Sequence, residues 1–139
     1  MDPSHWFVGT KFFEIIWSNQ IEDLKNILHP EAIFIYEFKD NKPAVKLQGS
    51  TKIIDRYNSK WKSHNTKKNV KIVSVSLQNI AENKLNYLIT HREVIQGIDY
   101  VITASHVITT GYYGDSIRIA GIQIKQLSKD KRVVGPIYG

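Results

Sequence analysis

The chain has 139 residues, the size of one domain and too few for two of ordinary size. Hydrophobic residues make up 42% and charged residues 23%, which excludes the composition of a disordered chain. The absence of cysteine excludes disulfides, thiol nucleophiles and thiolate metal sites, and it favours an intracellular, cytoplasmic location.

No apolar run approaches the roughly 20 residues of a transmembrane helix, and the N-terminus lacks the basic and apolar regions of a signal peptide. We therefore expect no membrane contact. The formal net charge is +6. Basic residues gather in two stretches of the sequence, and neither stretch contains a helix-turn-helix, zinc-finger or base-stacking motif. We therefore interpret both as solvated surface and expect no specific nucleic-acid partner. The basic residues of these stretches are Lys60, Lys62, Lys67, Lys68 and Lys71, then Lys125, Lys129, Lys131 and Arg132.

The N-terminal residues predict two helices in succession. Asp2-Pro3 fits a helix start, because aspartate caps well and proline suits the first helical position. Apolar residues at helical spacing follow as far as Trp17. A second, shorter helix is predicted to begin at Asn19 and to end before Pro30, since proline disfavours a helical residue ahead of it.

The next segment predicts a strand, a return strand and a third helix. Ala32 to Phe38 is rich in β-branched and aromatic residues, and Ala44 to Gln48 follows after a loop. Gly49-Ser50 then opens a helix with Ile53 and Tyr57 on its apolar face.

From Val70 onward the periodicity changes to two, which predicts strands separated by short turns. The order of elements predicts an α+β fold, with three N-terminal helices on one face of a strongly curved antiparallel sheet. We expect one domain over residues 1–139, with its core at about 4–127 and an irregular tail at 128–139. The four predicted strands are Val70–Ile80, Leu85–Ile95, Asp99–Thr110 and Asp115–Leu127.

Three passages carry a resemblance to a known family. They are Asp23-Leu24…Leu28-His29-Pro30-Glu31-Ala32-Ile33-Phe34, then Gly49-Ser50…Ile53-Ile54, and Ser116 to Gly121. Together with the order of elements over about residues 4 to 127, they resemble the nuclear-transport-factor-2-like superfamily, which includes ketosteroid isomerase, scytalone dehydratase and polyketide cyclases. The resemblance implies a cone-shaped half-barrel with an internal pocket for a small apolar molecule.

The turn at Gln96-Gly97 predicts the register of the central hairpin. A two-residue turn there pairs His91 with Ile102 and Tyr87 with His106. Both histidines then lie on the face that we assign to the helices.

The other two hairpins extend this register across the sheet. A four-residue loop at 111–114 would pair His106 with Ile119 and Ile102 with Gln123, and a two-residue turn at 82–83 would pair Ser74 with His91. The row between the histidines is then poor in bulk, since it holds Ala104 and Gly121.

A row of small side chains beside polar rows is typical of a ligand pocket. The alternative is that Phe34, Trp17 or Trp61 fills the hollow. The residues predicted to bind the ligand are Trp17, Phe34, Tyr57, Ser74, Tyr87, Glu93, Ala104, Gly121 and Gln123.

His91 and His106 are the candidate acid–base catalysts because they titrate near neutrality, and Tyr36 or Tyr87 is the candidate hydrogen-bond donor. The histidines are four residues apart in register, about 13 Å, so they would flank one ligand without bonding to each other. The alternative is that both are satisfied core histidines, His91 paired with Ser74 and His106 with Tyr87.

The isomerase resemblance places Tyr36 about where that enzyme has its general-base aspartate, so the base of that reaction is missing. We expect no metal, because the five histidines lack ligand spacing, and no cofactor, because no phosphate-binding glycine motif is present. Two functions stay open: a domain that binds a small apolar molecule, and a cofactor-free acid–base enzyme of isomerase, dehydratase or cyclase type.

The opposite sheet face alternates apolar residues with hydroxyls rather than with charges, which is unusual for a solvated face. We therefore predict a homodimer through this face, with Thr103 and Ile122 near its centre and Arg92 and Arg118 toward its edge. Its apolar members are Val73, Val75, Leu77, Leu88, Val101, Val107, Ile122 and Ile124.

Overall fold

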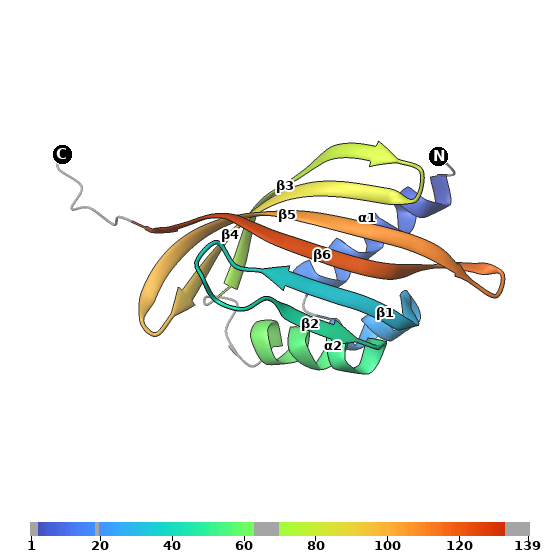
Figure 1. Ribbon diagram of the computed structural model, residues 1–139, viewed down its shortest axis with the longest axis horizontal. Coiled ribbons are helices and arrows are strands. Elements are labelled where there is room, and N and C mark those ends of the chain that lie inside the picture. Colours follow the sequence, from blue (N-terminus) through green and yellow to red (C-terminus); the bar gives the residue numbers. More distant parts are fainter. Residues whose placement is uncertain (1–2, 19, 63–69, 133–139) are drawn as a thin grey trace.

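A computed structural model describes residues 3–18, 20–62 and 70–132 of the chain. Two α-helices and two short helical segments of other types pack on a six-stranded sheet (Figure 1). The elements are α1 (Pro3–Trp17), the 3₁₀-helix η1 (Ile21–Asn26), β1 (Leu28–Glu37), β2 (Val45–Gln48), α2 (Ser50–Tyr57), the π-helical segment η2 (Asn58–Lys62), β3 (Val70–Ala81), β4 (Lys84–Ile95), β5 (Ile98–Tyr113) and β6 (Ser116–Lys131).

The sheet has the order β2-β1-β6-β5-β4-β3 and is not closed into a barrel. The prediction of an α+β fold with helices on one face of a curved sheet is confirmed. The sheet is mixed rather than antiparallel throughout. The pair β1 and β6 is parallel, and the other four pairs of neighbouring strands are antiparallel. Figure 1 shows α1 behind the long strands and α2 beside β1 and β2.

The second predicted helix is wrong in type and length. The chain forms a 3₁₀-helix at Ile21–Asn26 and enters β1 already at Leu28, so Pro30 lies inside the strand. The ladder between β1 and β6 is interrupted between Leu28 and Ile33. Proline is tolerated there because an interrupted ladder needs no N–H donor from it.

The core fills the space between the helices and the inner face of the sheet. Gly9 lets α1 approach β4 closely, since a Cβ on it would clash with Leu85 and touch the Tyr87 hydroxyl. The largest fully buried apolar side chains are Phe12, Ile21, Leu24, Leu28, Phe34, Ile53, Leu85, Ile102, Ile108, Ile119 and Ile122.

The predicted register of the central hairpin is confirmed. Ile95 lies opposite Ile98, His91 opposite Ile102 and Tyr87 opposite His106. The ladder between β4 and β5 runs without interruption over twelve residues of β4, so one short turn fixes the facing of both strands.

The predicted register between β5 and β6 is wrong. The strands continue to Tyr113 and Ser116, and the turn has two residues with Gly114 at φ +62°. Ala120 forms a bulge, because Thr110 pairs with Ile119 but Thr109 pairs with Gly121. The shorter turn keeps the predicted facing, because it shifts the pairing by an even number of residues. The bulge alone reverses the facing of the residues that follow Ala120.

Four residues of β6 therefore lie on the opposite side from the one predicted. Ile122 and Ile124 belong to the core, not to the outer face. Gly121 points outward, since a Cβ on it would lie 3.5 Å from Thr109, and Gln123 is exposed.

The predicted register between β3 and β4 is wrong for the same reason. Gln78 is a bulge between the Leu77–Tyr87 and Asn79–Asn86 pairs, so Ser74 pairs with the outward-facing Thr90 rather than with His91. A second bulge at Val73 restores the predicted facing, and Ile72 pairs with His91. Ser74 is exposed on the outer face, and Val75, placed opposite Ile89, is on the inner face.

β6 runs through Lys131, so residues 128–131 of the predicted irregular tail are strand. The Arg132 amide donates to the Asp99 carbonyl oxygen at 2.8 Å and ends the pairing with β5. The rest of the predicted tail, at 133–139, lies outside the described residues. Among the helices of the described ranges, none has the length and apolarity to cross a membrane.

Candidate functional site

A cavity lies between α1, α2 and the inner face of the sheet. The cavity has a volume of about 40 Å³, which is several times the volume that one buried water molecule needs on the same measure. Phe34 lines the cavity without filling it. The full lining is Phe13, Ile16, Phe34, Tyr36, Arg56, Tyr57, Lys60, Ile72, Ile89, His91, Ala104, His106 and Ile124.

One end of the cavity holds a buried carboxylate with two nitrogen partners. Glu93 Oε1 lies 3.2 Å from His91 Nε2, and Glu93 Oε2 lies 3.3 Å from Lys60 Nζ. Burial alone would raise the pKa of Glu93, but the His91 hydrogen bond and the Lys60 ammonium outweigh it and lower that pKa. Glu93 is therefore charged at neutral pH and joins β4 to η2.

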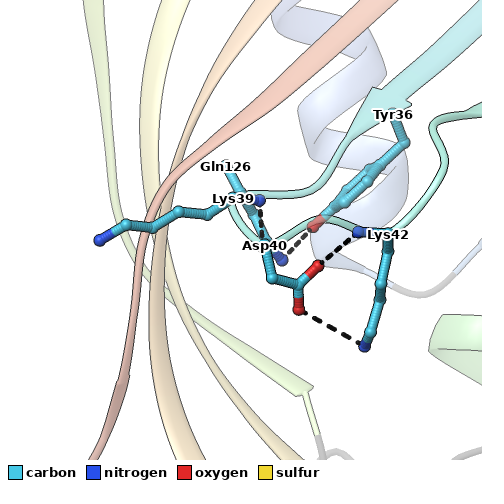
Figure 2. A network of polar contacts seen from close by, with 5 residues as sticks. All are labelled: Tyr36, Lys39, Asp40, Lys42 and Gln126. Carbon is cyan, nitrogen blue, oxygen red and sulfur yellow. Dashed lines mark hydrogen bonds and ion pairs between the residues drawn. The ribbon is translucent and has the colours of Figure 1, made fainter.

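Tyr36 and Gln126 form the neighbouring polar contact, drawn in Figure 2. Gln126 Nε2 donates to the Tyr36 hydroxyl oxygen at 2.9 Å, and Gln126 Oε1 accepts from the Lys39 backbone amide at 3.2 Å. Burial raises the pKa of Tyr36, so its hydroxyl stays protonated and remains a donor.

Gln126 lies at the site, whereas the alternation of the strand predicts Gln123 there. Both are glutamines of the same strand, but the Ala120 bulge turns Gln126 inward and Gln123 outward. A bulge leaves little trace in the alternation of a strand as apolar as this one, so no signal in β6 itself identified Gln126.

Two cations of the helical segment after β2 lie above aromatic rings of β1. The Arg56 guanidinium is 5.3 Å from the centre of the Tyr36 ring and 5.4 Å from that of Phe34. Lys60 Nζ is 5.7 Å from the Tyr36 ring. Arg56 and Lys60 are four residues apart, one helical turn, so both reach the same wall of the cavity.

His106 lies in a less polar part of the cavity wall. Its Nδ1 is buried and makes no hydrogen bond, and the Phe13 ring packs edge-on at 6.0 Å. Tyr87 stands opposite on β4, but no hydrogen bond joins it to His106 Nδ1, so the predicted Tyr87–His106 pair does not form. Burial lowers the pKa of His106 from 6.5 to about 3, and the nearby His91 lowers it further.

His106 is therefore a neutral imidazole at physiological pH. Tyr57 is a second buried polar group on the wall, since its hydroxyl makes no hydrogen bond and burial raises its pKa. Together they give the cavity hydrogen-bonding capacity that no described side chain uses.

The structure brings most of the sequence-predicted site residues to this cavity. Phe34, Tyr36, Tyr57, His91, Ala104 and His106 line it, and Glu93 bonds to the lining residue His91. Tyr87 is buried behind the Phe13 ring, at 4.5 Å between ring centres.

Four predicted site residues lie elsewhere. Trp17 is 61% exposed at the last residue of α1. The bulges at Gln78 and Ala120 place Ser74, Gly121 and Gln123 outside the cavity. The side chain of Trp61 lies outside the described residues. The same described part of the chain holds no group of three or more histidines and carboxylates arranged for a metal ion.

No protein-family model matches the chain, and no curated protein matches it closely in sequence. Solved structures do resemble it. A protein of unknown function with a cystatin-like fold from Xanthomonas campestris has a TM-score of 0.72 at 8% identity, over 90% of this chain and 92% of that one. An NTF2-like protein from Anabaena variabilis has a TM-score of 0.67 at 14% identity, over 91% of this chain and 92% of that one.

The epoxide hydrolase/cyclase-like enzyme SalBIII, described for its role in pyran ring formation in polyether salinomycin, is also similar. Its TM-score is 0.64 at 11% identity, over 90% of this chain and 92% of that one. Identities this low show the fold alone, which is the cystatin-like, nuclear-transport-factor-2-like fold.

The buried neutral His106 predicts a specific dependence of stability on pH. In the unfolded chain it takes up a proton near pH 6.5, but in the folded chain only near pH 3. Between these values the unfolded state binds more protons, so the free energy of unfolding falls as the pH drops. Below about pH 6 the loss should reach up to about 1.4 kcal/mol per pH unit, and above about pH 7 it should vanish.

Urea unfolding of the wild type and of His106→Gln between about pH 5 and 7.5 checks this. The variant keeps every other titrating group and should show a shallower loss toward low pH. Parallel profiles for the two proteins would contradict the assignment.

Proposed function

We propose that this chain, which has the nuclear-transport-factor-2-like fold, binds a small and mainly apolar molecule in the cavity between helices and sheet. One observation supports this most: the cavity wall is apolar at Ile89, Ala104 and Ile124, yet it carries a few separate polar groups. Pockets that bury and orient small ligands have this composition. The similar structures include a protein of unknown function and an epoxide hydrolase/cyclase-like enzyme, so the likeness of fold does not choose between binding and catalysis.

A second candidate is acid–base catalysis of isomerase, dehydratase or cyclase type, without a cofactor. The hydrogen bond between His91 and Glu93 on the cavity wall favours it. A carboxylate bonded to an imidazole orients the ring, selects its tautomer and stabilises its protonated form. His91 would then move the proton, Glu93 would position it, and Tyr36 would donate a hydrogen bond to the substrate.

We further propose that the outer sheet face pairs with a second copy of the chain. Val75 and Leu77 lie opposite the inward-facing Ile89 and Tyr87, and Ile122 and Ile124 are in the core, so these four residues do not belong to the outer face. The face still presents Leu88, Val101 and Val107. Between them lie hydroxyls such as Thr90 and Thr103, which bond to each other at 2.9 Å and so need no water there. A face of this composition suits sheet-on-sheet packing across a two-fold axis.

Ligand binding is tested by filling the cavity. 1-Octanol and octanoate are the probes, followed by isothermal titration and by the shifts of the His91 and His106 ring protons. Ala104→Phe places a benzyl group in the hollow and should weaken binding of the better probe by at least about tenfold. Ala81→Phe adds the same bulk at an exposed position of β3 and should bind like the wild type. Absence of saturable binding of both probes, or wild-type affinity in Ala104→Phe, would refute the proposal.

Catalysis is tested by proton exchange at carbon. The wild type should speed deuterium exchange at the α-carbon of cyclohexanone in D₂O beyond an equal concentration of imidazole. His91→Gln should lower the excess rate by about 10²-fold, the usual contribution of a positioned acid or base. His29→Gln, which changes a histidine outside the cavity, should leave the rate unchanged. Equal rates in His91→Gln and the wild type would limit the function to binding.

The homodimer is tested by sedimentation velocity at tens of micromolar. Thr103→Arg should sediment as a folded 16.0 kDa monomer, because it adds charge to the outer face alone. Ile122→Glu should instead unfold the chain, since this side chain is 1% exposed in the core. A wild-type protein that sediments at 16.0 kDa would overturn the dimer.

A further inference from the structure

A second hollow adjoins the cavity at its polar end. It is an open groove of about 550 Å³ between β4, β6 and the start of the loop after β1. Phe38, Ile95 and Ile102 give it apolar surface, and Glu93 and Gln126 give it polar groups. Lys60 lines both hollows, so cavity and groove meet at the Lys60–Glu93 ion pair.

The groove and the cavity mouth are lined by four cations, and each lies above an aromatic ring. A ring attracts a cation and restrains it, but it does not cancel the charge as a carboxylate would. The pairs are Lys42 over Phe38 at 5.5 Å, Arg56 over Tyr36 at 5.3 Å, Lys60 over Tyr36 at 5.7 Å and Lys129 over Tyr100 at 4.8 Å.

Acidic groups in the same region are fewer than the cations. Glu93 is the one carboxylate among the described residues that line either hollow, and it is already engaged with Lys60 and His91. Asp40 lies 3.8 Å from Lys42, but both side chains are at least half exposed, so this pair is weak. Within the described residues, Arg56 and Lys129 make no ion pair.

Lys129 reaches the groove because of a second bulge in β6. Gln126 pairs with Ala104 and Ser128 with Thr103, which leaves Leu127 as the extra residue. Lys129 therefore lies opposite Ile102, on the inner face with Gln126. Without this bulge, the alternation of the strand would place residue 128 inward and Lys129 on the outer face.

We propose that the ligand of this site is an amphiphile: an apolar body that enters the cavity and a carboxylate that stays in the groove. The inference rests on the proposed binding function and adds the charge of the ligand to it. Lys129 in the groove and Arg56 on the cavity wall are the lining cations that make no strong or weak ion pair among the described residues, and Lys60, which lines both hollows, lies where the two meet. The restraint by aromatic rings reduces the entropy that these long side chains lose when the anion binds.

The site favours an anion over a cation or a neutral molecule for a physical reason. Cations that converge on a hollow with apolar walls repel one another, and an incoming carboxylate relieves that repulsion. A ligand ammonium group would add to the repulsion, and a hydroxyl would leave it unchanged.

Three probes of equal length test the inference: octanoate, 1-octanol and octylammonium, titrated below micelle formation. Octanoate should bind about tenfold or more tightly than 1-octanol, and octylammonium should bind weakest. The preference for octanoate should shrink at about 0.5 M NaCl, because salt screens partly exposed charges.

Variants assign the effect to the groove rather than to the overall charge of +6. Arg56→Gln and Lys129→Gln should each weaken octanoate several-fold and leave 1-octanol unchanged. Lys84→Gln removes an exposed cation at the other end of β4 and should bind both probes like the wild type.

The outcomes separate this inference from the proposed function. Equal binding of octanoate and 1-octanol, both lost in Ala104→Phe, would overturn the anionic ligand and keep the apolar cavity. Octanoate binding that survives Ala104→Phe, or that weakens equally in Lys84→Gln, would mean general attraction to a basic surface and overturn the inference. No binding of either probe to the wild type would overturn the proposed function and the inference with it.

Discussion

The facing of side chains along β6 is the constraint on which the rest of the molecule depends. This strand lies between the parallel β1 and the antiparallel β5, so each of its side chains belongs either to the core or to the outer face. The bulges at Ala120 and Leu127 each reverse which residues of the strand face the core. Between them Ile122, Ile124 and Gln126 point inward, and beyond the second bulge Lys129 does so. The first extra residue places Ile124 on the cavity wall and Gln126 beside Tyr36, and the second places Lys129 in the groove.

Glu93 imposes a second constraint on the structure, because a buried carboxylate is unstable without compensating positive charge. Its compensation comes from opposite sides: His91 from its own strand and Lys60 from η2. The helical segment after β2 is thereby tied to β4 across the mouth of the cavity. Loss of Lys60 would leave Glu93 with His91 alone among these partners, so the ion pair connects the position of the helix to the electrostatics of the site.

The sequence predicted the fold and the central hairpin because these depend on local signals. The turn at Gln96-Gly97 fixes an uninterrupted ladder, and both histidines follow from it by counting. The bulges were not predictable in the same way. β6 has isoleucines at 117, 119, 122 and 124, so inward and outward assignments differ little in apparent hydrophobicity. The burial of Ile122 and Gln126 depends on pairing with β5 and β1, which are distant in sequence.

The loop before β6 shows the same limit. Gly111 to Gly114 suggests a four-residue turn, yet Tyr112 and Tyr113 extend the strand and the turn needs only Gly114 and Asp115. A glycine at each end of a segment does not tell which of them bends the chain, because both tolerate the required backbone angles.

Two of the six buried side-chain atoms that lack a hydrogen bond among the described residues belong to the wall of the proposed ligand site. Tyr57 Oη and His106 Nδ1 are buried and make no hydrogen bond within the described residues, so both are available to polar atoms in the cavity. Both residues line the cavity, while the satisfied contacts of Tyr36, Gln126, His91 and Glu93 lie toward its polar end. A purely structural core would gain stability by replacing Tyr57 with phenylalanine and His106 with leucine. Their presence at the cavity wall is consistent with a ligand whose own polar atoms supply the missing hydrogen bonds, and the same groups would then contribute to its orientation.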